Sequence, residues 1–300
     1  MAAGGLGVAA TASFYAVIGR WRKHRGSCGA SGAENADLAQ LGAQLLALSL
    51  AAERAARGGS APPGAAQLKS ICAASDRALA SLSAFSSSNS PALTAALGEV
   101  LRESLLALAV VAHECGFAPS DAYKSAVEKV RGRTPYMAEW GDGSRASTPE
   151  EAMKLWKARK MAQKATAAAR AEDGDACGGQ AGSQESSVAA AEGAREGLLF
   201  TVARLVAGGC PWTAVQTAEV LLGYLKEECE EAAEELEAFA ALGVQDVGIG
   251  PGARRAAVVR RALASEMGDV LFDVLMAVFL AARDRGFRPL AVLEASAGPA

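Results

Sequence analysis

Apolar residues recur every three or four positions through most of the chain, a spacing typical of one face of an α-helix. Short runs of glycine, proline, serine and asparagine interrupt this pattern. Ser120 is predicted to cap the start of one helix, and Ser147 or Thr148 to cap the next. The pattern predicts helices over 31–58, 65–85, 91–115, 119–133, 147–171, 213–242 and 253–285.

Composition also favours an all-α fold. Valine, isoleucine and threonine are sparse, whereas alanine, leucine, glutamate, arginine and lysine are plentiful, and the second group prefers helix to strand. A net charge of -3 gives no electrostatic argument for a nucleic-acid partner. The 6 cysteines form no C-x-x-C pair and the chain has 2 histidines, so no zinc pattern is present and we interpret the cysteines as reduced thiols.

The first 35 residues differ from the rest. Residues 1–33 contain no aspartate or glutamate, and an uncharged stretch is followed by the basic run Arg20–Arg25. The stretch is short and rich in glycine and alanine for a membrane span, so a membrane partner is not expected. We prefer an organelle-targeting segment or a disordered tail, with a weak signal anchor as the alternative. The expected location is the cytoplasm, or an organelle if this segment is a targeting signal.

The two halves of the chain resemble each other. The segments that begin at Ala96 and Glu266 share apolar positions at a shift of 170 residues, and both end in Gly-Phe-x-Pro. Shared leucine and alanine can arise from composition, but the common ending favours a repeat. Residues 171–195 are rich in glycine, serine and alanine and are predicted to form a linker. We therefore expect one helical unit over 36–170 and a second over 196–300, packed as a bundle.

Acidic residues follow one stripe of the last predicted helix. Glu266, Asp269 and Asp273 are spaced by three and four positions and lie among methionine, valine, leucine and phenylalanine. In the preceding helix, Glu228 and Glu231 border the apolar stripe, where a neighbouring helix would meet them. Because an unpaired buried carboxylate is costly, something positive is expected to face these groups.

Antiparallel packing of these two helices would bring Glu228, Glu231, Glu266 and Asp269 together. Four hard oxygen ligands suit Mg²⁺, with Mn²⁺ as the alternative, and leave positions open for water and phosphate oxygens. An acid-rich helix is more often only a solvated face. The carboxylates of the last helix favour a metal site because their neighbours are apolar.

These residues resemble a known family. The stretch "CPWTAVQTAEVLLGYLKEECEE" (210–231) followed by "EMGDVLFDV" (266–274) resembles the MazG nucleoside triphosphate pyrophosphohydrolases, which carry a CPW-x-x-x-QT entry, an E-E-x-x-E helix and an E-x-x-D helix. The resemblance is good over 196–289 and weak over 38–165. It implies an all-α fold of two MazG-like units in tandem, packed as a pseudo-dimer or homodimer, since members of this family assemble as dimers.

The resemblance implies Mg²⁺-dependent hydrolysis of a nucleoside triphosphate to the monophosphate and pyrophosphate. It places Glu228, Glu231, Glu266 and Asp269 as metal ligands, and Glu227 with Glu228 as the catalytic carboxylates. The substrate-binding candidates are Lys129, Arg131, Arg133, Lys226 and Trp212. Trp212 is more readily explained as a packing anchor than as a base-stacking residue. The basic run 129–133 is alternatively a solvated helix face.

The first half departs from the family pattern. Ala96 and Glu99 stand where the second half has Glu266 and Asp269, and alanines 51, 52 and 55 align with the three glutamates of E-E-x-x-E. This half is expected to lack a metal and to serve as a structural unit. The second half has a long insertion between 231 and 266 and no basic segment after its E-x-x-D helix. Lys129, Arg131 and Arg133 are candidates to substitute for that segment across an interface.

Two other classes of function stay open. A helical protein that binds nucleotide or a partner without turnover is favoured by the degenerate first half, and it would bind metal without releasing product. A helical oligomerisation protein without a metal would show no thermal shift with Mn²⁺.

Overall fold

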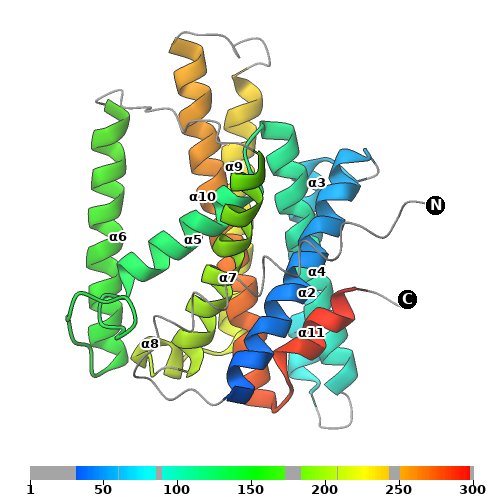
Figure 1. Ribbon diagram of the computed structural model, residues 1–300, viewed down its shortest axis with the longest axis vertical. Coiled ribbons are helices and arrows are strands. Elements are labelled where there is room, and N and C mark those ends of the chain that lie inside the picture. The colour runs from blue at the N-terminus through cyan, green and yellow to red at the C-terminus, as the bar shows by residue number, and fades with distance from the viewer. Residues whose placement is uncertain are drawn as a thin grey trace.

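The computed structural model describes residues 32–59, 61–85, 90–172, 184–207, 209–242 and 251–297. Within these ranges the regular elements are all α-helices, which confirms the predicted all-α class. Most of the predicted N-terminal segment and part of the insertion after 242 lie outside the described residues. The helices, shown in Figure 1, are α2 (Gly32–Arg57), α3 (Gly64–Ser83), α4 (Ser90–Cys115), α5 (Pro119–Arg133), α6 (Pro149–Glu172), α7 (Gln184–Ala207), α8 (Pro211–Ala214), α9 (Ala218–Ala241), α10 (Pro251–Arg285) and α11 (Pro289–Ser296).

One of the two predicted helix caps is confirmed. At the start of α6, Glu151 N donates to Thr148 Oγ1 at 3.2 Å, and the Glu151 carboxylate accepts from Ser147 N at 2.7 Å. This reciprocal arrangement satisfies backbone donors that a helix start leaves unpaired. The prediction for Ser120 is wrong, because α5 begins at Pro119 with Ala118 as its N-cap. Proline suits the first helical position since it has no N–H to leave unpaired and its φ is already helical.

Two predicted boundaries also differ from the structure. The predicted helix over 213–242 is two helices, α8 and α9, and Thr217 Oγ1 caps α9 by accepting from Val220 N at 3.4 Å. The predicted linker over 171–195 is helical from Gln184 onward. Arg195 in this part is only 5% exposed, and its guanidinium lies over the Tyr123 ring and pairs with Glu53 at 3.3 Å. Long-range packing therefore outweighs a local composition that is typical of linkers.

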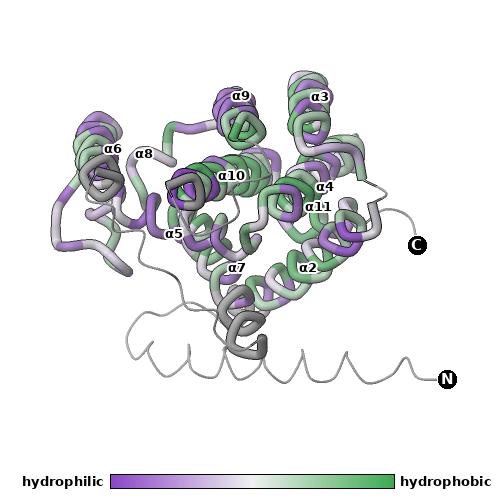
Figure 2. The backbone as a smooth tube through the Cα atoms, turned by 90° about the horizontal axis from the view of Figure 1, so that it is seen from above, coloured by the Kyte–Doolittle hydropathy of each residue, from purple (hydrophilic) through white to green (hydrophobic). Residues whose placement is uncertain are grey.

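The apolar side chains of both halves form one core. α9 packs along α10 and α3 packs along α4, and the two helix pairs meet because α3 contacts α9 and α4 contacts α10. In the view of Figure 2, α10 lies between α6 on one side and the α3–α4 region on the other. α6 packs mainly against α5 and α8, so it stands apart from α9 and α10 over much of its length (Figure 1).

α10 is the most deeply buried helix of the second half. All residues from Val270 to Ala282 are buried, and Asp273 is the charged residue among them. None of the helices in the described ranges is long and apolar enough to span a membrane.

Two glycines mark reciprocal contacts between the halves. A Cβ on Gly98 of α4 would lie 3.0 Å from Val292 O and from Ser296 N of α11. A Cβ on Gly268 of α10 would lie 2.6 Å from Ala122 O and 3.2 Å from Ala126 N of α5. Glycine is required at both crossings because any side chain would push the helices apart.

These two crossings are related by one shift. Adding 170 to the numbers of Gly98, Ala122 and Ala126 gives Gly268, Val292 and Ser296. Each long helix therefore packs on the short helix that follows the other long helix.

The packing also bears on one alignment. The sequence comparison matched α2 to α9, so that alanines 51, 52 and 55 replaced three glutamates. In the structure α3 runs along α4 as α9 runs along α10. α3 contains a single carboxylate, Asp76, so the helix packed along α4 carries no acidic stripe like that of α9.

Candidate metal centre

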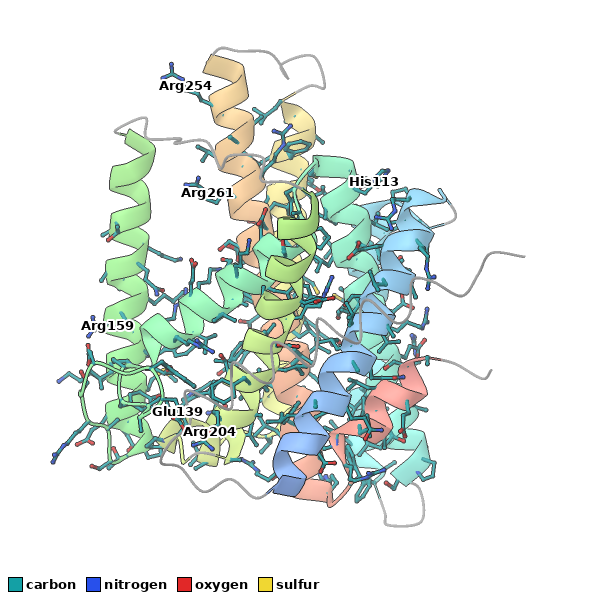
Figure 3. The ribbon with its side chains drawn as sticks, in the orientation of Figure 1. His113, Glu139, Arg159, Arg204, Arg254 and Arg261 are labelled. Carbon is teal, nitrogen blue, oxygen red and sulfur yellow. The ribbon has the colours of Figure 1, made fainter. Side chains whose placement is uncertain are left out.

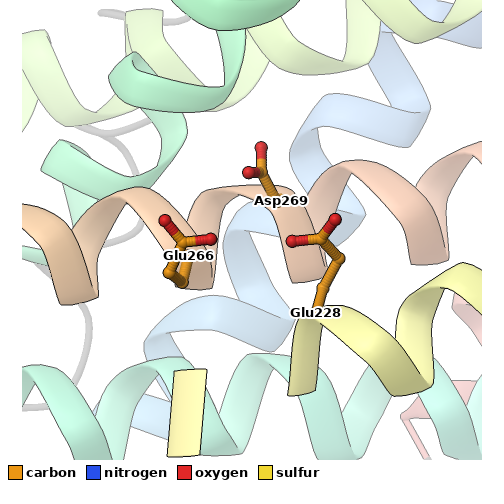
Figure 4. A group of neighbouring side chains, drawn as sticks. All are labelled: Glu228, Glu266 and Asp269. Atoms are coloured by element: carbon orange, nitrogen blue, oxygen red, sulfur yellow. The ribbon is translucent and has the colours of Figure 1, made fainter. Parts of the chain in front are cut away.

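Three carboxylates from two helices converge beside the core. Glu266 and Asp269 lie one helical turn apart on α10, and Glu228 projects toward them from α9 (Figure 4). One oxygen from each of the three lies within 4.8 Å of one oxygen from each of the others. The spacing of three residues on α10 and its close packing with α9 produce this convergence.

Glu231 lies beside this group rather than inside it. Its side chain is exposed, and it is not among the three that converge. It is nevertheless close enough for its charge to raise the pKa of Glu228 and of Glu266. Glu227, the other predicted catalytic residue, is also exposed. The structure thus brings together three of the four predicted ligands, with the fourth on the rim.

The carboxylates carry more negative charge than their surroundings balance. Burial raises the pKa of Glu228 to about 7, and repulsion from Asp269, Glu231 and Glu266 adds to the effect. Burial also raises the pKa of Glu266, although Lys129 opposes that change. Raised carboxyl pKa values mean that the ionised forms are destabilised in the folded protein. A divalent cation at this position would remove that destabilisation.

Lys129 reaches this group from the first half of the chain. Its ammonium donates to Asp269 Oδ2 at 2.5 Å and to Ser265 O at 3.2 Å, and it lies 3.8 Å from Glu266 Oε1. Lys129 lies on α5, which crosses α10 at Gly268. Because Gly268 lets the backbones of the two helices approach, the lysine can extend along α10 to the acidic residues.

The other two residues of the basic run face elsewhere. Arg131 is placed 5.3 Å from the Trp140 ring and donates to Thr201 Oγ1 of α7 at 3.0 Å, and burial lowers its pKa. Arg133 lies 5.3 Å from the Trp156 ring and donates to Gln163 Oε1 of α6 at 2.9 Å. In this structure both arginines join α5 to its neighbouring helices.

A surface ion pair reinforces the same junction. Glu139, in the loop after α5, pairs with Arg204 of α7, and the two lie close together in Figure 3. The loop is thereby held against α7. This helps to fix α5, and with it Lys129.

Two further substrate-binding candidates do not contact the acidic group. Lys226 is on α9 but forms an ion pair with Asp76 of α3. Trp212 stacks on Trp156, with ring centroids 5.7 Å apart and an interplanar angle of 15°. The Trp212 indole N–H is buried and meets no acceptor within the described part of the chain. These contacts favour the packing role for Trp212.

Asp273 lies beyond the group, deeper in the core. It is 6% exposed and sits one turn after Asp269 on α10. Burial holds its pKa well above the usual range, Glu228 and Asp269 raise it further, and Lys160 of α6 opposes the change. Lys160 is a basic group that we did not select from the sequence. The feature of the sequence that could have identified it is its position in "LWKARK", four residues after Trp156 on the same helix.

The residues present fit a hard divalent cation. Carboxylate oxygens are the ligands that Mg²⁺ and Mn²⁺ prefer, and three protein ligands leave room for water and phosphate oxygens. The exposed Glu231 is available as a further ligand on the same turn of α9 as Glu228. The ammonium of Lys129 neutralises part of the charge and would have to share Asp269 with a cation.

Comparison with known proteins identifies the same region. Residues 216–297 match the MazG nucleotide pyrophosphohydrolase domain. This range contains α9, α10 and α11, and therefore all three converging carboxylates. No curated protein and no solved structure matches the chain. The acidic group thus lies in a region similar to a domain whose general activity is nucleotide pyrophosphate hydrolysis.

Proposed function

We propose that this protein hydrolyses nucleoside triphosphates to nucleoside monophosphates and pyrophosphate with Mg²⁺, or Mn²⁺ in its place. The observation that carries the proposal is the convergence of Glu228, Glu266 and Asp269 inside the range that matches the MazG domain. The three residues would hold the cation, with Glu231 as a further ligand. Such a cation would supply Lewis acidity toward a phosphate oxygen and favour ionisation of the attacking water.

Residues of this chain would carry the remaining steps. Water attacks the α-phosphorus, the bond from that phosphorus to the bridging oxygen breaks, and pyrophosphate leaves. Glu227, exposed on α9 next to Glu228 in the sequence, would accept the proton of the water. Lys129 would exchange its contact with Asp269 for one with the polyphosphate, whose charge it would neutralise.

We propose that the first half is a related unit without a metal. Glu99, at the position that corresponds to Asp269, accepts two hydrogen bonds from Arg77 at 3.0 and 2.9 Å. Asp76, the single carboxylate of α3, is paired with Lys226. These two acids are therefore paired with basic side chains. The reciprocal glycine crossings support an internal pseudo-dimer, in which the first half contributes α5 and Lys129 to the second.

The test is a panel of nucleoside triphosphates with Mg²⁺ or Mn²⁺, with detection of monophosphate and pyrophosphate. Glu228→Gln should lower turnover by about 100-fold, since it removes one ligand while keeping the side-chain shape. Glu234→Gln, an exposed acid on the same helix, is the matched control and should retain activity. Full activity in Glu228→Gln would refute the proposed site.

One observation favours a second candidate, a protein that binds nucleotide or a partner without turnover. Lys129 already neutralises Asp269 and lies near Glu266, so a cation is not required to balance those two groups. In that case Mn²⁺ and nucleotide would bind, as measured by calorimetry, and no pyrophosphate would appear with any member of the panel.

A further inference from the structure

Two cysteines face each other where the two halves meet. Cys72 lies on α3 and Cys229 on α9, and these helices pack against each other. Both are free thiols; Cys72 is partly exposed and Cys229 is buried, 2% exposed. A hydrogen bond between the two thiols is the largest influence on the pKa of each. The halves therefore meet at a dithiol that the metal chemistry does not use.

A neighbouring ion pair holds the two cysteines opposite each other. Asp76 follows Cys72 by four residues on α3, and Lys226 precedes Cys229 by three residues on α9. Asp76 and Lys226 form an ion pair. The contact thus lies one turn after Cys72 on α3 and one turn before Cys229 on α9, so the two helices run antiparallel here. This register keeps the two thiols adjacent.

The two cysteines differ in the way that the two members of a redox pair usually do. The pKa of Cys72 is lowered to about 7, first by the hydrogen bond from Cys229 and then by Lys226, against burial, Glu230 and Asp76. A partly exposed thiol with a lowered pKa is the reactive type, since the thiolate is the nucleophile. Cys229 is shielded from solvent but touches Cys72, which suits it to react second, with the oxidised Cys72 rather than with the oxidant.

We propose that Cys72 and Cys229 form a reversible disulfide when the protein meets hydrogen peroxide, and that this bond weakens metal binding by Glu228. Cys229 is the residue next to Glu228 on α9. The link to the metal rests on the proposed function, whereas formation of the disulfide does not.

The chemistry is a two-electron oxidation by the peroxide. The Cys72 thiolate attacks one peroxide oxygen, the O–O bond breaks, and the departing oxygen becomes water after protonation, which leaves a sulfenic acid. The Cys229 sulfur then attacks the Cys72 sulfur. The S–S bond forms, the S–O bond breaks, and the leaving hydroxide takes the thiol proton as water. Two thiols and one peroxide give one disulfide and two waters.

The bond would act on Glu228 because of where Cys229 lies. Sulfurs in a disulfide are about 2.05 Å apart, much closer than two thiols in contact. We therefore expect closure of the bond to draw α9 toward α3 around Cys229. Glu228 projects toward α10 (Figure 4), so a movement of its backbone toward α3 draws its carboxylate away from Glu266 and Asp269.

The experiment treats the folded full chain with hydrogen peroxide, then blocks free thiols and maps peptides by mass spectrometry. The expected product is a peptide pair joined through Cys72 and Cys229, lighter by two hydrogens and released by dithiothreitol. Cys72→Ser should prevent this product while retaining Mn²⁺ binding before oxidation. Cys115→Ala is the matched control, because Cys115 is buried on α4 and burial raises its pKa to about 12; it should not change the product.

Mn²⁺ titration of the oxidised and the reduced protein gives the second measurement. We expect about a tenfold loss of affinity on oxidation, recovered on reduction and absent in Cys72→Ser. Oxidation of Cys72 to sulfinic acid alone, or a lack of reaction at Cys72, would overturn the disulfide. A mapped disulfide with unchanged Mn²⁺ affinity would overturn the coupling to Glu228. If neither form of the protein binds Mn²⁺, the proposed metal site fails, and peptide mapping still decides the disulfide.

Discussion

Replacing Glu228 by glutamine should make the metal-free protein more stable and at the same time remove its response to metal. In the folded protein the pKa of Glu228 is about 7, because of burial first and then repulsion from Asp269, Glu231 and Glu266. The ordinary value is 4.5. The folded protein therefore binds this proton more tightly than the unfolded chain, and ionisation of Glu228 costs stability.

The size of the effect depends on pH. A tenfold difference in proton affinity between the folded and unfolded states corresponds to about 1.4 kcal/mol. Because solvent screens part of the repulsion at the half-buried Glu228, the ionised side chain should destabilise the folded state by about 2–3 kcal/mol above pH 7. The destabilisation grows as the pH rises from about 4.5 to about 7 and is nearly absent below that range. Glu228→Gln should therefore increase the free energy of unfolding by about 2–3 kcal/mol at pH 8 and by less than about 1 kcal/mol at pH 5.

The assay is denaturant unfolding in the presence of a chelator, repeated with saturating Mn²⁺. Bound metal should stabilise the parent protein by about 2.7 kcal/mol at a metal concentration 100 times Kd, and Glu228→Gln should lose most of that gain. Glu234→Gln should behave like the parent protein in both conditions. A Glu228→Gln protein that is less stable than the parent at pH 8 without metal would refute the reasoning, since it would show that the carboxylate stabilises the fold.

Three further predictions follow from the same geometry. Lys129→Met should raise Mn²⁺ affinity by about tenfold, because the lysine no longer competes for Asp269, and it should weaken nucleotide binding. Calorimetry with each ligand measures both affinities. A loss of both would indicate that the lysine has a purely structural role. Mn²⁺ affinity of the parent should rise as the pH increases through about 7, because Glu228 must release its proton to bind the cation; an affinity that is flat between pH 6 and 8 would contradict its role as a ligand. Gly268→Ala should destabilise the protein by about 1–3 kcal/mol, because its Cβ would lie 2.6 Å from Ala122 O. Gly223→Ala, which has open space around it, should instead stabilise the protein by about 0.5–1 kcal/mol. Denaturant unfolding measures both changes.

Local features of the chain predicted most of the helices and the acidic stripe. Helical periodicity depends on neighbours three and four residues away, so the positions of α2, α3, α4, α6 and α10 follow from the sequence to within a few residues. The same spacing predicted that Glu266 and Asp269 share a face. Ser120 was misassigned because serine is a common cap, whereas Pro119 one position earlier starts the helix.

Long-range contacts account for what the sequence did not reveal. The segment from Gln184 to Arg195 is helical because Arg195 and Ala194 are buried against other helices, and its own composition gives little sign of this. Arg131 and Arg133 differ from Lys129 in their contacts because the three side chains leave α5 in different directions. A run of basic residues does not indicate which member will face an acidic group.

The sequence by itself therefore determined an all-helical protein with a stripe of carboxylates on its last long helix, since both properties depend on spacing along one helix. Only the tertiary structure decided what lies beside that stripe. The crossing of α5 over α10 at Gly268 delivers Lys129, and the antiparallel contact of α3 with α9 brings Cys72 to Cys229 beside Glu228. Both contacts require helices that are far apart in the sequence to approach each other closely. Burial of the shared core brings these helices together, and no local pattern in the sequence predicts which helices will meet.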